Sequence, residues 1–387
     1  MKLFDNTEVA FSLKSYSELL RANFLYKMIQ NQALVRIGSA ITNFALKAHL
    51  PVEGIIRATV FNHFCGGVTE EDCIPTIDKL HSKGVCSVLD YSVEGKENES
   101  EFDQTLAKVL KVIDFGKINK AIPFAVFKPT GLGRFALFQK ITEKEELTSE
   151  EKTEWIRVKE RFHTIGEAAY VKGFPLLIDG EESWMQDAAD DLIEEMMERY
   201  NTKRALVFNT LQMYRHDRLD YLKALNERAL EKGFFVGMKV VRGAYMEKER
   251  ERAEAKGYES PICIDKRATD LNFDAAALYM MDRPNMALFA GTHNEHSTYL
   301  VMDWAKKYKI EKKDKNLWFG QLYGMSDNIS FNLSKSGYNV AKYLPFGPVR
   351  DVMPYLIRRA EENTSVAGQT SRELDLIGAE RKRRKKQ

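Results

Sequence analysis

The segment ALVFNTLQMYRHDRLDYLKALNERALEKGFFVGMKVVRG, residues 205–243, contains the repeating unit from which the fold is predicted. It begins with an apolar run at 205–211, continues with a stretch of helical periodicity at 218–233, and ends with a second apolar run at 234–243. Nearly continuous apolar strands joined by a helix are typical of parallel strands that are buried on both faces. The segment therefore predicts a β-α-β unit.

The same alternation extends along most of the chain. We predict eight strands, at residues 85–92, 122–129, 174–179, 205–211, 234–243, 286–293, 316–322 and 338–347. Eight such units are what a (βα)8 TIM-type barrel requires, so this α/β fold is favoured over the alternative, an open doubly wound sheet.

Other segments flank or interrupt the predicted barrel. Residues 1–80 have helical periodicity and predict an N-terminal helical region before a barrel at 81–375. The charged segment 138–168 predicts a helical insertion within the barrel. Residues 376–387 contain the basic run RKRRKK, which predicts a solvated, frayed tail. The alternative for this tail is a contact with an anionic surface such as lipid head groups.

The composition is that of an ordinary globular protein. The 387 residues are 44% hydrophobic and 29% charged. The formal net charge of +2 argues neither for nor against nucleic acid, and no nucleic-acid partner is expected. The four cysteines form no CxxC pair and no zinc-type spacing, so we expect neither a disulfide framework nor a metal site. Arg36 and Lys47 interrupt the most apolar stretch, 33–50, which predicts a protein that is at most peripheral to a membrane.

The predicted strand ends are rich in polar side chains. In a barrel of this kind the chemistry lies at the carboxyl ends of the strands. These ends carry Asp90, Glu94, Lys128, Asp179, Gln212, Arg242, Tyr245, His293, Asn294, Gln321, Leu322 and Tyr343, a set that indicates an enzyme. For Asp179 the alternative is an N-cap of the following helix. Lys266 and Thr269 lie just before a predicted helix, where they could bind a phosphate. The alternative is that they belong to a solvated loop.

The segment PYLIRRAEEN, residues 354–363, predicts a helix with a cation in its apolar stripe. Arg359 lies along the apolar face, whereas Arg358 is about 100° further round the helix and can pair with Glu362. An inward guanidinium requires an anionic partner, because an unpaired buried charge is strongly destabilising. A carboxylate matches its bidentate geometry.

Four motifs resemble the proline dehydrogenase family. They are VVRGAYMEKERERA (240–253), GTHN (291–294), FGQLYGMSDNIS (319–330) and KYLPFGPVRDVMPYLIRRAEEN (342–363). The third is similar to the monofunctional, mitochondrial-type members. The resemblance implies a distorted (βα)8 barrel that holds FAD at the carboxyl ends of its strands. It also implies oxidation of L-proline to Δ1-pyrroline-5-carboxylate, with hydride transfer from proline C5 to flavin N5.

The resemblance implies catalytic and substrate-binding residues. Catalytic positions are Lys128, Asp179, Arg358 and Arg359, with the two arginines clamping the proline carboxylate. Tyr245, Leu322 and Tyr343 are implied to pack on the substrate ring, where the Tyr343 phenol leaves no room for a ring hydroxyl. Glu94 is implied to be a gate that pairs with Arg358 when substrate is absent.

The implied FAD contacts are Lys128, Gln212, Lys239, Arg242, Gly243, Ala244, Lys266, Thr269, His293, Asn294 and Glu362. Two positions depart from the pattern of bacterial bifunctional members: Lys239 replaces an arginine near flavin N5, and Ile264 replaces a threonine in the phosphate segment. The sequence offers no obvious general base for the proline amine. We therefore predict that substrate is deprotonated in solution or by water.

The expected partners are L-proline and a membrane quinone that accepts the electrons. An alternative activity is the dehydrogenation of hydroxyproline or another cyclic amino acid, and a non-enzyme alternative is a barrel that only binds a ligand. The expected location is the bacterial cytoplasm, peripheral to the inner membrane, or the mitochondrion if the source is eukaryotic.

Overall fold

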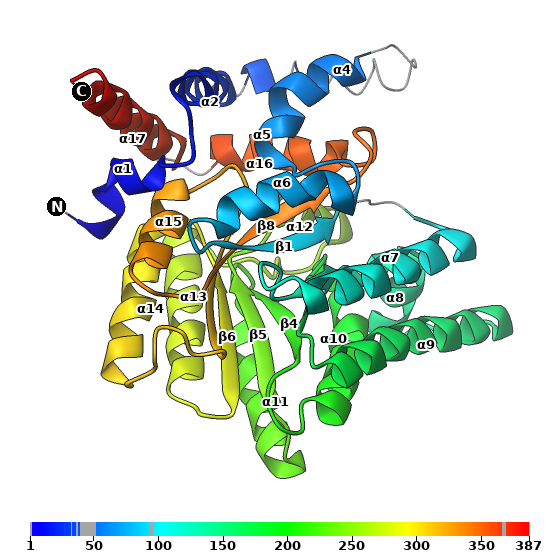
Figure 1. The fold of residues 1–387 in the computed structure, drawn as a ribbon. Helices are drawn as coiled ribbons and strands as arrows, with labels where there is room; N and C mark the ends of the chain where they lie inside the picture. The colour runs from blue at the N-terminus through cyan, green and yellow to red at the C-terminus, as the bar shows by residue number, and fades with distance from the viewer. Residues whose placement is uncertain are drawn as a thin grey trace. The chain divides into compact units, whose positions relative to one another are not determined.

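The computed structural model describes residues 2–31, 33–35, 38, 52–92, 96–365 and 369–386. Eight strands close into a barrel in sequential order, and their paired neighbours run parallel (Figure 1). The strands are β1 (Cys86–Tyr91), β2 (Ala125–Phe127), β3 (Leu176–Ile178), β4 (Val207–Gln212), β5 (Val236–Val241), β6 (Met286–Gly291), β7 (Leu317–Leu322) and β8 (Val340–Phe346). Each lies within a predicted strand or extends one residue beyond it. The prediction of a (βα)8 barrel is confirmed, and closure excludes the open sheet.

Aromatic side chains fill part of the barrel core. The Phe124 ring makes edge-to-face contacts with Phe208, Phe289 and Trp318, with ring centroids 5.6, 5.5 and 5.2 Å away. Gly320 makes room for this layer, because a Cβ added there would lie 2.1 Å from the Phe289 ring. Large apolar side chains from neighbouring strands therefore exclude water from this layer.

The chain divides into two compact units, residues 95–320 and residues 1–94 with 321–387. The unit formed by 95–320 contains α7 (Glu99–Ile118), α8 (Phe135–Thr142), α9 (Ser149–Lys172), α10 (Ser183–Tyr200), α11 (Arg218–Lys232), α12 (Met246–Lys256), α13 (Lys266–Met281) and α14 (Glu295–Lys307). The charged segment expected as an insertion forms parts of α8 and α9, which connect β2 to β3. Thr148 and Glu151 form a capping box that starts α9, and Gly173 ends it in a left-handed conformation.

The second unit, residues 1–94 with 321–387, contributes η1 (Leu3–Asp5), α1 (Thr7–Ala10), α2 (Tyr16–Ile29), α4 (Glu53–Ile56), η2 (Arg57–Phe61), α5 (Asn62–Phe64), α6 (Glu70–His81), α15 (Asp327–Lys335), α16 (Met353–Ser365) and α17 (Gln369–Arg384). The expectation of a frayed basic tail is wrong, because residues up to 384 belong to α17, which packs against α2 and α1 (Figure 1). Thr7 donates a hydrogen bond of 2.9 Å to the buried carboxylate of Glu380. Arg384 donates to the main-chain oxygens of Lys14 and Phe11, at 2.8 and 2.9 Å.

No helix among the described residues has the length and apolar character needed to cross a membrane.

Candidate active site

Asp179 and Lys239 form an ion pair in the unit of residues 95–320. Asp179 directly follows β3, and Lys239 lies within β5 with a buried side chain. A buried ammonium group is tolerated when a carboxylate compensates its charge. The alternative role for Asp179 as a helix cap is wrong, because the N-cap of α10 is Glu182.

Gln212 joins the loops that follow three strands. Its side-chain amide donates to the main-chain oxygen of Glu181 at 2.6 Å and accepts from the main-chain N–H of Ala244 at 3.2 Å. Gly243, directly before Ala244, has a φ of +142°, and a Cβ added there would lie 2.5 Å from the Tyr214 ring. The glycine therefore permits the chain after β5 to approach Gln212 and Tyr214 closely.

Glu181 is a site residue that the sequence prediction missed. Its buried carboxylate accepts hydrogen bonds from the Thr130 N–H at 3.0 Å and the Thr130 hydroxyl at 2.6 Å. Burial raises the pKa of Glu181 to about 7, although Thr130 and the charge of Lys128 act in the opposite direction. Glu181 thus ties the loop after β2 to the loop after β3, and its position two residues after Asp179 was the available sequence signal.

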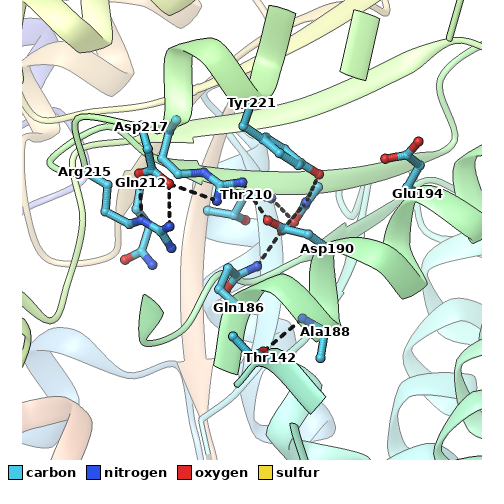
Figure 2. A network of polar contacts seen from close by, with 12 residues as sticks. Thr142, Gln186, Ala188, Asp190, Glu194, Thr210, Gln212, Arg215, Asp217 and Tyr221 are labelled. Carbon is cyan, nitrogen blue, oxygen red and sulfur yellow. Dashed lines mark hydrogen bonds and ion pairs between the residues drawn. The ribbon is translucent and has the colours of Figure 1, made fainter. Parts of the chain in front are cut away.

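Glu181 is also connected to a buried polar network, of which Figure 2 shows Gln186, Asp190 and their neighbours. The Glu181 N–H donates to the Gln186 side-chain oxygen at 2.8 Å, and Gln186 donates to Asp190 at 2.8 Å. Asp190 also accepts from Asn209 at 2.8 Å and from Arg218 at 2.6 Å. Because the network joins α10, β4 and α11, it fixes the loop relative to the strands.

The Glu181→Gln substitution is expected to change how stability depends on pH. A carboxyl with a raised pKa binds its proton more tightly in the folded protein, so its contribution is greatest at low pH and is lost as the pH rises through 7. The loss of unfolding free energy between about pH 5 and pH 8 should therefore be smaller in the variant, by about 2–4 kcal/mol.

Denaturant unfolding at the two pH values measures this difference. The exposed Glu251→Gln substitution on α12 is the control and should leave the wild-type pH dependence unchanged. Equal pH dependence in wild type and Glu181→Gln would show that this carboxyl ionises as readily in the folded state as in the unfolded chain.

Arg242 is held by four neighbours after β5. Its guanidinium donates to Asp270 at 2.7 Å, to Thr292 at 2.7 Å and to Ser297 at 2.9 Å, and its Cζ lies 4.6 Å from the centroid of the Phe273 ring. These contacts fix the position of the guanidinium at the end of the strand.

The first turn of α13 contains Lys266 and Thr269, the residues predicted to contact phosphate. Lys266 pairs with Asp270 at 2.6 Å, and the Thr269 hydroxyl donates to the main-chain oxygen of Asp265 at 3.2 Å. The Asp265 carboxylate caps the helix by accepting from the Ala268 N–H at 2.7 Å. Burial opposes ionisation of Asp270, but Lys266 and Arg242 outweigh it and lower its pKa.

The remaining predicted residues of this unit also lie at strand ends. Lys128 follows β2 and is half-buried, His293 follows β6 and is partly exposed, and Tyr245 precedes α12 and is buried. Asn294 is the N-cap of α14, where its side chain accepts from the Ser297 N–H at 3.1 Å. Asn294 therefore has a structural role in starting the helix.

The arginine pair lies on α16 in the unit of 1–94 with 321–387. Arg359 is 8% exposed and its Cζ lies 5.2 Å from the Tyr355 ring centroid, whereas Arg358 is less buried. Tyr355 and Leu356 pack in a buried apolar cluster with residues such as Phe64 of α5. The prediction that Arg359 points inward is confirmed.

Leu322 and Tyr343 lie in the same unit as the arginine pair. Leu322 ends β7 and is partly buried, whereas Tyr343 lies within β8 and is buried. The main-chain N–H of Tyr323 donates to the main-chain oxygen of Tyr343 at 2.8 Å, which links the end of β7 to β8. Glu94, the expected gate, and the side chain of Glu362 lie outside the described residues.

A buried charge cluster that the sequence prediction missed holds the loop after Leu322. The Lys342 ammonium has no exposed side-chain surface and lies 2.9 Å from the Asp327 carboxylate. It also donates to the main-chain oxygens of Met325 and, at 3.4 Å, Leu322. Lys14 reaches the other oxygen of Asp327 at 3.0 Å. Burial opposes ionisation of Asp327, but the two ammonium groups outweigh it and lower its pKa.

The sequence is similar to a family of known proteins. The family model described as "Proline dehydrogenase" matches residues 73–372. The chain is 34% identical to the carbapenem antibiotics biosynthesis protein CarD of Pectobacterium carotovorum, over 90% of this chain and 91% of that protein. It is 30% identical to the mitochondrial proline dehydrogenase 1 of Dictyostelium discoideum, over 99% of this chain and 75% of that protein.

Solved structures share the fold. Proline utilization A from Bdellovibrio bacteriovorus superposes with a TM-score of 0.72 over 94% of this chain and 37% of that one, at 21% identity. The chain thus spans little more than a third of that larger protein, and the likeness establishes the fold alone. The family is established by the match that covers all eight strands and α16: this chain belongs to the proline dehydrogenase family.

Proposed function

We propose that this protein is an FAD-dependent dehydrogenase that oxidises L-proline to Δ1-pyrroline-5-carboxylate and passes the electrons to a membrane quinone. The observation that carries the proposal is the buried guanidinium of Arg359 beside Arg358, on a helix within the part of the chain that matches the family model. A guanidinium in this setting suits a carboxylate, which supplies both the charge and the planar geometry that it requires.

The two arginines would hold the substrate carboxylate. Arg359 is fixed by its packing against Tyr355, and Arg358 is more exposed. A substrate that is anchored by two hydrogen-bonding forks loses the freedom to rotate, which favours a reactive alignment. Leu322 and Tyr343 would pack on its ring.

The donor set of residues 95–320 fits a flavin. Gln212 and the cations Lys128, Lys239 and Arg242 suit the carbonyl oxygens and ribityl chain of the cofactor, and Lys266 suits its phosphates. Bound FAD would supply the oxidant, accepting at its N5 the hydride that leaves proline C5. The cations would stabilise negative charge on the reduced ring.

A second candidate substrate is another cyclic amino acid, such as hydroxyproline. The similarity to CarD, named for carbapenem antibiotics biosynthesis, favours including it in the tests. The resemblance to the family favours proline, since it implies that the phenol of Tyr343 leaves no room for a hydroxyl on the ring.

Anaerobic addition of L-proline to the purified protein tests the proposal. We expect the visible absorbance of the oxidised flavin to disappear with L-proline and to persist with trans-4-hydroxy-L-proline. Protein purified without any flavin absorbance, even after incubation with FAD, would contradict the proposal. Bleaching by hydroxyproline alone would support the second candidate.

A further inference from the structure

Helix α2 presents large apolar side chains to solvent. Tyr16, Leu20, Phe24 and Met28 are 38%, 40%, 67% and 41% exposed. They recur every four residues and so form a stripe along one side of the helix. The buried side of α2, which carries Leu19, Ala22, Tyr26 and Ile29, already packs within its unit. The exposed stripe therefore does not contribute to the packing of α2 in its unit, and exposed apolar surfaces commonly mark an interaction site.

The charges around this stripe are positive. Arg21 and Lys27 of α2 are exposed. The only acidic residue of the helix is Glu18, and its carboxylate is occupied by the Ser15 N–H at the helix start and by Lys79 at 3.3 Å. The exposed side of α2 therefore combines apolar groups and cations without an uncompensated acid.

The basic end of α17 lies beside the start of α2. The two helices pack against each other (Figure 1), and Arg384 donates to the main-chain oxygens of Phe11 and Lys14, just before α2 begins. Arg383 and Arg384 pair with Glu380, but Lys382, Lys385 and Lys386 are exposed. A cluster of cations thus continues the positive charge of α2.

We propose that the stripe of α2 and the basic end of α17 dock on an anionic membrane surface, with α2 lying in the plane of the lipid head groups. Helices that bind in this way have an apolar side and flanking lysines or arginines, which attract anionic lipids. A second copy fits less well, because it would present the same apolar groups and cations and no opposite charge to the basic end of α17. The inference extends the proposed electron transfer to a membrane quinone. Its evidence is the exposed side chains of α2 and α17, and it does not depend on which substrate the protein oxidises.

Vesicle co-sedimentation of the full-length protein tests the surface. Wild type is expected to bind vesicles of phosphatidylcholine with phosphatidylglycerol more tightly than phosphatidylcholine alone, and less tightly at high salt. The double variant Leu20→Ser with Phe24→Ser should reduce binding by at least about tenfold. The double variant Lys382→Glu with Lys385→Glu should remove the preference for anionic vesicles.

The matched control is Ile118→Ser with Leu230→Ser, which removes two exposed apolar side chains elsewhere and should leave binding unchanged. Thermal unfolding and flavin content check that each variant is folded. Absence of wild-type binding, or equal binding by the α2 variant, would overturn the inference. Loss of a dimer in the α2 variant without loss of vesicle binding would also overturn it, in favour of a second copy.

Flavin bleaching by L-proline, measured in the same preparations with a soluble electron acceptor, separates the two proposals. An α2 variant that keeps this activity and loses vesicle binding supports both proposals. A protein that binds vesicles through α2 but is not reduced by L-proline would contradict only the proposed function.

Discussion

The Arg359→Ala variant is expected to lose about 2–4 kcal/mol of transition-state stabilisation, measured as kcat/KM for L-proline. The guanidinium is buried on α16. If it holds the substrate carboxylate as proposed, its removal would take away a charged hydrogen-bond donor that water cannot replace with the same geometry. Stopped-flow reduction of the flavin at varied L-proline concentration measures both the binding and the hydride-transfer step.

Two variants calibrate this prediction. Arg359→Lys keeps the charge but loses the planar fork, so an intermediate loss is expected. Arg358→Ala removes the neighbouring, more exposed arginine and shows how the two share the carboxylate. Unchanged reduction kinetics in Arg359→Ala, with flavin content preserved, would refute the assignment of this residue to the carboxylate.

The Lys342→Met variant is expected to lower the free energy of unfolding by about 3–5 kcal/mol. Methionine has a similar length but leaves Asp327 without the closer of its two ammonium partners, and it leaves the main-chain oxygen of Met325 without this donor. An incompletely compensated carboxylate inside the protein is the physical source of the loss. Denaturant unfolding of the wild type and the variant gives the value.

A double-mutant cycle with Asp327→Asn measures the interaction energy between Lys342 and Asp327, apart from their contacts with other residues. Removing both charges should cost less than the sum of the single substitutions, because neither charge then remains without its partner. Lys14 can reach water when Asp327 is neutralised, since 22% of its side chain is exposed. The exposed Lys335→Met substitution on α15 is the control and should have little effect. Strict additivity of the two buried substitutions would mean that they stabilise the fold independently.

Much of the fold was predictable from local patterns. The runs that became β4 and β5 are mostly apolar, and the intervening α11 has helical periodicity, so the alternation of elements is visible within a short window. The inward orientation of Arg359 followed in the same way from its spacing relative to Tyr355 and Leu356. The helical state of the basic C-terminal segment was missed, because its many cations are typical of a solvated tail. The contacts that hold it, from Glu380 to Thr7 and from Arg384 to Phe11 and Lys14, join the two ends of the chain only in the folded protein.

The sequence by itself determined the order of strands and helices, the family, and the residues that the motifs mark at strand ends. Only the tertiary structure decided which charges are paired, namely Asp179 with Lys239 and Asp327 with Lys14 and Lys342. It also decided that Thr130 is the hydrogen-bond donor to the buried Glu181 carboxylate. The physical reason is that periodicity reports the environment of each residue within its own helix or strand, whereas the partner of a buried charge comes from a segment far away in the chain. Its identity depends on how the closed barrel and its helices bring those segments together.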